Sequence, residues 1–140
     1  MPIALAVHGL WKCYAAGVNG CSARVWVLRG ATFSVGRGER VGVIGARGAG
    51  KTTLLDCLRG LRRPEAGVID VAPEARSELL LLDEGEGTME EIPANRSRTV
   101  IVAARAAGNL LDVVDRCLLL HEGTLLPYRP PTRVRRVAEG

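Results

Sequence analysis

The stretch that decides the fold reads Gly45-Ala46-Arg47-Gly48-Ala49-Gly50-Lys51-Thr52-Thr53. An apolar run at 41–44 precedes it, and a second, mostly apolar segment at 54–58 follows it. The expected order is strand, glycine-rich loop and helix, which is the context that distinguishes a phosphate-binding loop from a chance match to GxxxxGKT. The alternative is a glycine-rich turn before an ordinary helix.

Each residue type in this loop suits a bound phosphate chain. Glycines let consecutive backbone N–H groups turn towards a phosphate, and the following helix adds the positive end of its dipole. Lys51 should reach the outer phosphates as a point charge, and the Thr52 hydroxyl is placed to bind Mg²⁺ beside them. The predicted nucleotide contacts from the loop are Gly45, Arg47, Gly48, Ala49, Gly50, Lys51, Thr52 and Thr53.

Composition predicts one globular domain with an aliphatic core. The chain has 140 residues, of which 47% are hydrophobic, 24% charged and only 4% aromatic, a balance typical of neither disordered nor fibrous proteins. The net charge is +4, and Lys12 and Lys51 are the only lysines in an arginine-rich chain. A compositional bias of the source explains this better than nucleic-acid binding does, so no nucleic-acid partner is expected.

The cysteines and the apolar segments indicate a soluble protein of the cytoplasm. Cys13, Cys21, Cys57 and Cys117 form no CxxC pair and no cluster with histidine at the spacing of metal ligands, which argues against a zinc site. The first residues lack the basic start of a secretory signal. No apolar run approaches the roughly 18 residues that cross a bilayer. Reduced thiols in the cytosol are therefore expected.

Several strands should precede the phosphate loop. The apolar pattern predicts strands at 3–8, 25–28 and 31–35, with a loop at 17–20 and a break at Arg29-Gly30. A tight turn at 36–39 then leads into the strand before the phosphate loop. Because about forty residues of expected β-structure come first, the chain differs from small nucleotide kinases, whose first strand carries the loop.

The segment from 28 through the loop to 67 resembles the nucleotide-binding subunit of ABC transporters. It has the same order of apolar strand, Gly-Glu turn, phosphate loop, helix and a Gly-Leu, Pro, Gly turn. The resemblance implies an α/β fold: a P-loop NTPase core with a mainly parallel sheet, N-terminal antiparallel strands and a C-terminal β-hairpin. Tyr14 resembles the family's aromatic residue that stacks on adenine; the alternative is a ring packed at a strand end.

A second motif follows the predicted strand at 79–82. That strand ends in Asp83-Glu84, which resembles the family's second nucleotide motif at the edge of the sheet. The resemblance implies that Asp83 holds Mg²⁺ and that Glu84, with Lys51, is catalytic, orienting or deprotonating the attacking water. The alternative is a strand that ends in solvated acids.

Beyond these motifs the chain departs from the family. After the predicted strand at 67–71 it has neither the glutamine loop nor the helical subdomain with the signature motif, and the sequence contains no glutamine. Glu90 could imitate the family's aspartate near the dimer interface. Where the family has a histidine that contacts the terminal phosphate, this chain has Arg105. Arg105 could still reach that phosphate as a permanent cation, or it is a surface residue.

The remaining segments complete the expected domain. A strand at 99–103, a short helix at 108–115 and a hairpin of 117–120 with 124–126 are predicted, whereas 91–98 is too short for a full helix. His121 should lie in the hairpin turn, and His8 should be structural. One nucleotide-binding domain is expected at 1–127, with a flexible basic tail at 128–140.

The hypothesis from the sequence is a Mg-ATP-binding protein that resembles an ABC-transporter ATPase subunit. Its cofactors would be ATP and Mg²⁺, and hydrolysis would be slow or dependent on a partner. That partner would be a complete ABC subunit or a membrane permease at the inner face of the membrane. A second copy of this chain could not take that place, because the chain has no signature motif. The alternatives are a non-hydrolysing regulatory module that docks on a complete ABC subunit, and a gene remnant with exposed apolar surface.

Overall fold

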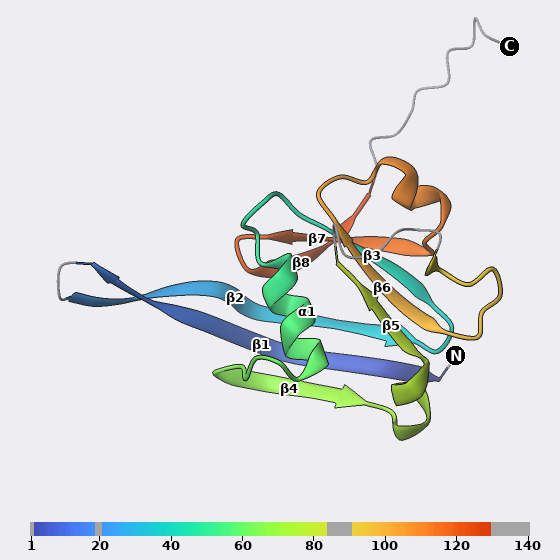
Figure 1. Cartoon of the computed structure of the whole chain (residues 1–140), viewed down its shortest axis with the longest axis horizontal. Helices are drawn as coiled ribbons and strands as arrows, with labels where there is room; N and C mark the ends of the chain where they lie inside the picture. The colour runs from blue at the N-terminus through green and yellow to red at the C-terminus, as the bar shows by residue number, and fades with distance from the viewer. Residues whose placement is uncertain (1, 19–20, 84–90, 130–140) are drawn as a thin grey trace, which may run out of the picture.

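The computed structural model describes residues 2–18, 21–83 and 91–129, which form two sheets around one α-helix (Figure 1). The strands are β1 (Ile3–Val18), β2 (Cys21–Gly36), β3 (Arg40–Ile44), β4 (Ala66–Val71), β5 (Leu79–Leu82), β6 (Thr99–Ala104), β7 (Arg116–His121) and β8 (Thr124–Tyr128). The helices are α1 (Lys51–Arg59) and the 3₁₀ helices η1 (Pro73–Glu78) and η3 (Gly108–Asp112). No described helix is long and apolar enough to cross a bilayer.

The first sheet is antiparallel, in the order β2-β1-β4. Its strands are longer than the sequence predicts, because β2 continues through Arg29-Gly30 and the expected break there is wrong. Gly30 has φ 77°, and the pairing of β1 with β2 shifts register nearby, so a bulge replaces the break. The predicted loop at 17–20 is also wrong in part, since β1 extends to Val18; residues 19–20 lie outside the described residues.

The second sheet is mainly parallel, in the order β5-β6-β3-β7-β8. Strand β3 lies between β6 and β7 and is parallel to both, β5 is parallel to β6, and β8 returns antiparallel to β7. The predicted parallel core and C-terminal hairpin are thereby confirmed. His121 ends β7 opposite Thr124, beside a turn formed by Glu122 and Gly123, which both have positive φ.

The predicted helix at 108–115 is wrong in length and type. A 3₁₀ helix occupies only Gly108–Asp112, because the Leu110 carbonyl accepts the N–H groups of both Val113 and Val114 and the turn ends there. Leu110 nevertheless packs on the sheet and is 3% exposed. The described segment 91–98 contains no α-helix, as its length predicts.

Helix α1 packs between the two sheets (Figure 1). Leu54, Leu55, Cys57 and Leu58 are buried against apolar side chains from β1, β2, β3, β6 and β7 in one aliphatic cluster. A second cluster covers the opposite face of the parallel sheet, with Leu110 of η3 packed on it. The core is therefore aliphatic, and it holds the N-terminus of α1 against both sheets.

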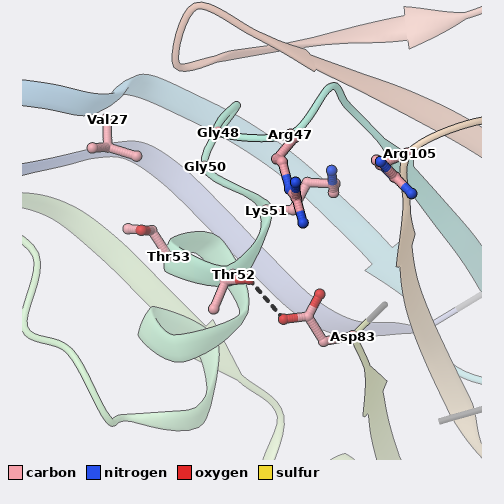
Figure 2. A pocket seen from close by; sticks show the side chains of 9 residues that line it. All are labelled: Val27, Arg47, Gly48, Gly50, Lys51, Thr52, Thr53, Asp83 and Arg105. Atoms are coloured by element: carbon pink, nitrogen blue, oxygen red, sulfur yellow. Dashed lines mark hydrogen bonds between the residues drawn. The ribbon is translucent and has the colours of Figure 1, made fainter. Parts of the chain in front are cut away.

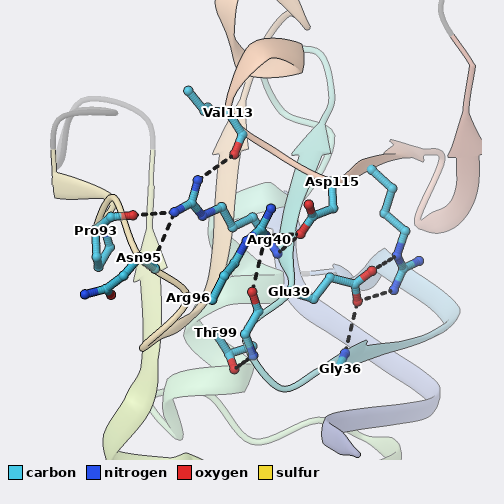
Figure 3. Close-up of polar contacts among 11 residues, drawn as sticks. Gly36, Glu39, Arg40, Pro93, Asn95, Arg96, Thr99, Val113 and Asp115 are labelled. Carbon is cyan, nitrogen blue, oxygen red and sulfur yellow. Dashed lines mark hydrogen bonds and ion pairs between the residues drawn. The ribbon is translucent and has the colours of Figure 1, made fainter. Parts of the chain in front are cut away.

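The amino ends of the parallel strands are fastened by arginines (Figure 3). Arg40 donates to the backbone carbonyls of residues 93, 95 and 113, and its own N–H donates to Asp115 at 2.8 Å. A hydrogen bond from Arg96 holds the pKa of Asp115 below its ordinary value, despite partial burial. Burial alone would raise the pKa of Glu39, but hydrogen bonds from Arg116 and a backbone N–H lower it.

The carboxyl ends of β3, β5 and β6 meet at the opposite edge of the same sheet. The phosphate loop (residues 45–53) follows β3, Asp83 follows β5 and Arg105 follows β6. Open α/β sheets bind ligands in the crevice outside the carboxyl ends of their strands. The strand order thus brings together residues that are up to sixty positions apart in the chain.

Candidate functional site

A cleft of about 520 Å³ opens at this carboxyl edge (Figure 2). Side chains and backbone from the phosphate loop, the first turn of α1, β2 and the ends of β5 and β6 surround it. Its lining residues are Val27, Arg47, Gly48, Gly50, Lys51, Thr52, Thr53, Asp83 and Arg105. Of the predicted loop contacts, Gly45 and Ala49 do not line the cleft.

The phosphate loop reaches its shape through glycines in the left-handed region. Gly48 has φ 83° and Gly50, the N-cap of α1, has φ 105°. A Cβ on Gly50 would lie 2.8 Å from Cγ1 of Val27, so the close approach of β2 also requires a glycine here. The loop then enters α1, where the Leu54 N–H donates to the Gly50 carbonyl at 2.9 Å.

Lys51 lies inside the curve of the loop. Its Nζ donates to the carbonyls of Gly45 and Ala46, the latter at 3.2 Å, and the residue is only 7% exposed. The ammonium group is therefore held by backbone oxygens at the place where the loop would enclose a phosphate. A phosphate oxygen would offer this cation a charged acceptor, which makes a stronger hydrogen bond than a neutral carbonyl.

Thr52 and Asp83 are in direct contact across the cleft. The Thr52 hydroxyl donates to Oδ2 of Asp83 at 2.8 Å, and Asp83 is 6% exposed (Figure 2). Magnesium prefers a few oxygen ligands from the protein and takes the rest from phosphates and water. A hydroxyl and a carboxylate side by side beside the phosphate loop fit that ion. The described residues contain no cluster of three or more His, Cys, Asp or Glu that would form an all-protein metal cage.

Two arginines extend the positive charge of the cleft. Arg47 comes from the loop and the exposed Arg105 from the end of β6 (Figure 2). Together with Lys51 they give three cations against one carboxylate, that of Asp83, among the described lining residues. The balance favours a polyanion.

Tyr14 is not among the described lining residues of the cleft, but it contacts one of them. Its hydroxyl shares a hydrogen bond of 3.1 Å with Oγ1 of Thr53, and the ring centroid is 5.3 Å from Nζ of Lys12 and 5.5 Å from Cζ of Arg62. Both cations therefore contact the ring that the resemblance assigns to adenine. Glu84 and Glu90 lie outside the described residues.

Sequence reasoning missed Val27 as a lining residue. Nothing in the apolar pattern of β2 indicates which of its residues faces the loop. A second hollow, of about 820 Å³, lies around the other side of the phosphate loop and shares Val27, Arg47 and Gly48 with the cleft. Trp26 and His121, the last residue of β7, line this second hollow.

Comparison with known families matches residues 28–106 to the model described as "ABC transporter". Among curated proteins, the lipoprotein-releasing system ATP-binding protein LolD of Chromohalobacter salexigens is 42% identical over 77 residues, which are 55% of this chain and 31% of the relative. The doxorubicin resistance ATP-binding protein DrrA of Mycobacterium tuberculosis is 40% identical over 70 residues, 50% of this chain and 19% of the relative. The matches thus span under a third of the length of both relatives.

Solved structures share the fold. An ATP-binding cassette of an ABC transporter in an ADP conformation superposes with a TM-score of 0.65 at 10% identity, covering 90% of each chain. A metal-chelate type ABC transporter in an inward-facing conformation gives a TM-score of 0.63 at 18% identity, covering 89% of this chain and 82% of the other. At these identities the likeness concerns the fold alone.

Proposed function

The chain belongs to the ABC transporter family of ATP-binding domains, and on that premise we propose that it binds Mg-ATP in the cleft at the carboxyl edge of β3, β5 and β6. The observation that carries the proposal is the 2.8 Å hydrogen bond between Thr52 and Asp83 beside Lys51. It joins the two predicted metal-binding oxygens next to the predicted phosphate-binding cation.

In this proposal each residue of the cleft has one task. The backbone of the phosphate loop (residues 45–53) binds the phosphates, and Lys51 leaves its loop carbonyls for a phosphate oxygen. Thr52 and Asp83 would hold the Mg²⁺ ion, which when bound neutralises phosphate charge. Arg105 would contact the terminal phosphate in the position where the family has a histidine. The predicted stacking of adenine would use the ring of Tyr14, which Lys12 and Arg62 already contact.

We also propose that hydrolysis is slow or depends on a partner. Glu84 is the predicted residue for orienting or deprotonating the attacking water. The chain runs from β4 to β5 through the short helix η1 alone, where the family resemblance implies a glutamine loop and a helical subdomain. A complete ABC subunit or a permease at the inner face of the membrane would then supply what the connection omits.

Isothermal titration calorimetry with ATP and Mg²⁺ tests the binding proposal. The native chain should bind, and Lys51→Ala should weaken binding by about ten- to a hundredfold, because a hydrogen bond to a charged group contributes about 1.5–3 kcal/mol. Arg76→Ala is a matched control, since Arg76 is an exposed cation of η1 outside the described cleft lining. Absence of binding by the native chain, or equal losses in the two variants, would refute the proposal.

A phosphate-release assay tests hydrolysis separately. Slow turnover by the native chain that disappears in Glu84→Gln would support a catalytic role for Glu84, with circular dichroism to confirm folding. Turnover that survives the substitution would remove Glu84 from the mechanism. Stimulation by an added complete ABC subunit would show dependence on a partner.

A second candidate function is a regulatory module that docks on a complete ABC subunit without hydrolysing ATP. The direct β4–η1–β5 connection and the absence of glutamine from the sequence favour it. A pull-down with a purified complete subunit, combined with the phosphate-release assay, separates the candidates. Association without any turnover supports the module, and turnover by the isolated chain supports the enzyme.

A further inference from the structure

We propose that strand β4 is a docking edge for a second copy of this chain, and that two copies join their β4 strands antiparallel about a two-fold axis. In the described part of the chain, β4 is an outer strand of the first sheet, pairs only with β1 and lies along the outside of the molecule (Figure 1). No residue of β4 is among the described lining residues of the nucleotide cleft. The proposal therefore goes beyond the proposed function and does not depend on it.

The structure describes four outer strands, and three of them carry features that hinder pairing with a further strand. In β2, the Arg29 N–H donates to the Gly123 carbonyl at 2.7 Å. Two arginine side chains donate to backbone carbonyls of β5, and β8 contains Pro127, which has no N–H to offer. Proteins commonly protect sheet edges by such means. Strand β4 reads Ala-Gly-Val-Ile-Asp-Val, with Asp70 as its single charged residue.

The backbone of β4 shows which of its groups form the open edge. The Ala72 N–H, just after the strand, donates to the Ala4 carbonyl at 2.9 Å and so points towards β1. Successive residues of a strand direct their N–H and C=O groups to opposite edges, so those of Ile69 and Val71 point away from β1. A second strand laid along this edge would pair these groups.

The side chains of β4 add apolar surface at the same edge. Val68 is 59% exposed, and Trp11, which pairs with Ala66 from the neighbouring β1, is 39% exposed. A two-fold axis at Val68 would set this side chain against Val68 of the second copy. Because the two valines would not form a hydrogen-bonded pair, they would lie at the closer of the two spacings in an antiparallel ladder. Both would leave water on association, which is favourable.

This register also suits the other residues of the strand. It places Ile69 opposite Gly67 of the second copy, where the two can exchange backbone hydrogen bonds. Asp70 falls opposite Ala66 of the second copy, so two carboxylates do not meet, an arrangement that would be destabilising. The sequence of β4 is therefore compatible with pairing to itself.

The charges on either side of β4 identify a second copy as the occupant. Residues 62–65 carry two arginines and one glutamate, whereas residues 70–76 carry two acids and one arginine. Antiparallel pairing brings the first, net positive flank of one copy beside the second, net negative flank of the other. Arg63 of each copy, which is exposed, would lie beside the exposed Glu74 of the other. The two-fold axis forms this complementary contact twice.

Sedimentation velocity of the native chain over a concentration series provides the first test. A species of twice the 14.9 kDa chain mass should appear as the concentration rises, equally with and without Mg-ATP. Val68→Lys should weaken the dimer at least about tenfold, because two like charges would meet at the axis. Val25→Lys is the matched control: Val25 is 50% exposed on β2, the other outer strand of the same sheet. It should leave the dissociation constant unchanged.

A charge exchange tests the register of the two flanks. Arg63→Glu and Glu74→Arg should each weaken the dimer, because each variant places like charges beside one another in both flank contacts. The double variant restores opposite charges and should recover most of the native affinity. A folding defect in one variant would not be repaired in this way, so the recovery reports on the contact between copies.

Amide hydrogen exchange on the native chain locates the contact without any substitution. Protection of the Ile69 N–H should rise with protein concentration, because pairing would take this outward-pointing group out of water. A native chain that stays monomeric at every concentration would overturn the proposal. So would a dimer that leaves the Ile69 N–H unprotected, that loses equal affinity in Val68→Lys and Val25→Lys, or that the double charge variant fails to restore. Mg-ATP binding by a chain that stays monomeric would leave the proposed function standing.

Discussion

Replacing Gly50 by alanine should destabilise the protein and distort the phosphate loop for two separable reasons. Gly50 has φ 105°, and a left-handed conformation costs a residue with a Cβ about 1–2 kcal/mol. The new Cβ would also lie 2.8 Å from Cγ1 of Val27, and relieving such an overlap costs about 1–3 kcal/mol. The free energy of unfolding should therefore fall by about 2–5 kcal/mol, the sum of the two costs.

The neighbouring Gly48 provides the matched control. It has φ 83°, and a Cβ there would meet nothing within 4 Å, so Gly48→Ala should incur only the first cost, about 1–2 kcal/mol. The double variant Gly50→Ala, Val27→Ala should recover most of the second cost, relative to Val27→Ala alone, because Cγ1 is gone. Urea unfolding followed by circular dichroism measures all four variants. Equal losses in the two glycine variants, or no recovery in the double variant, would refute the role of Val27.

Three further predictions concern single side chains. Asp83→Asn should weaken ATP binding about tenfold in Mg²⁺ but not in EDTA; calorimetry in both buffers checks this, and equal losses would contradict a metal role. Because Arg96 lowers the pKa of Asp115 in the folded state, their contact stabilises the protein above the ordinary carboxyl pKa and is lost as pH falls through the folded value. Arg96→Leu should thus flatten the fall of stability in acid unfolding, and an unchanged slope would contradict it. Tyr14→Phe should lower the free energy of unfolding in urea by about 0.5–1.5 kcal/mol, through loss of the hydrogen bond to Thr53; unchanged stability would show that this bond contributes nothing.

The phosphate loop could be predicted because its determinants are local. The apolar strand at 41–44, the glycines and Lys51 stand within about a dozen consecutive residues, and the loop geometry needs little beyond them. The strand before Asp83 was also predictable, since four consecutive leucines bounded by polar residues indicate a strand. The expected burial is confirmed only for Leu82, because the other three leucines of this outer strand of the described sheet are half-buried. The contact between Asp83 and Thr52 agrees with the rule that parallel strands deliver their ends to one edge of a sheet, although the sequence predicted only that both residues bind the same ion.

Features that depend on pairing between distant segments could not be predicted. Arg29-Gly30 has the composition of a strand break, but a register shift against β1 absorbs the positive φ of Gly30 as a bulge. The environment of Tyr14 is set by Thr53 and Arg62, which lie some forty to fifty positions away in the chain. The pattern of apolar residues contains no information about such contacts, so a motif could suggest a role for Tyr14 but not its surroundings.

Strand β5, which ends just before Asp83, is held by side-chain hydrogen bonds in addition to its pairing in the sheet. Strand β5 is the outer strand of the described sheet and pairs only with β6. Arg59 of α1 donates to the Leu81 carbonyl at 3.2 Å, and Arg98 donates to the Leu79 carbonyl at 3.4 Å. These side chains bond to backbone oxygens of β5 and so restrict its movement.

Side-chain contacts also hold helix η1, the segment that leads into β5. Arg37, in the turn before β3, makes two hydrogen bonds of 3.0 Å to the carboxylate of Glu78, and Ala75 of η1 is fully buried. The connection from β4 to β5 is thus anchored by the β2–β3 turn and by the core. The phosphate loop and Asp83 therefore both follow strands of this anchored core, β3 and β5, and the short connection through η1 leaves the contact between Thr52 and Asp83 intact.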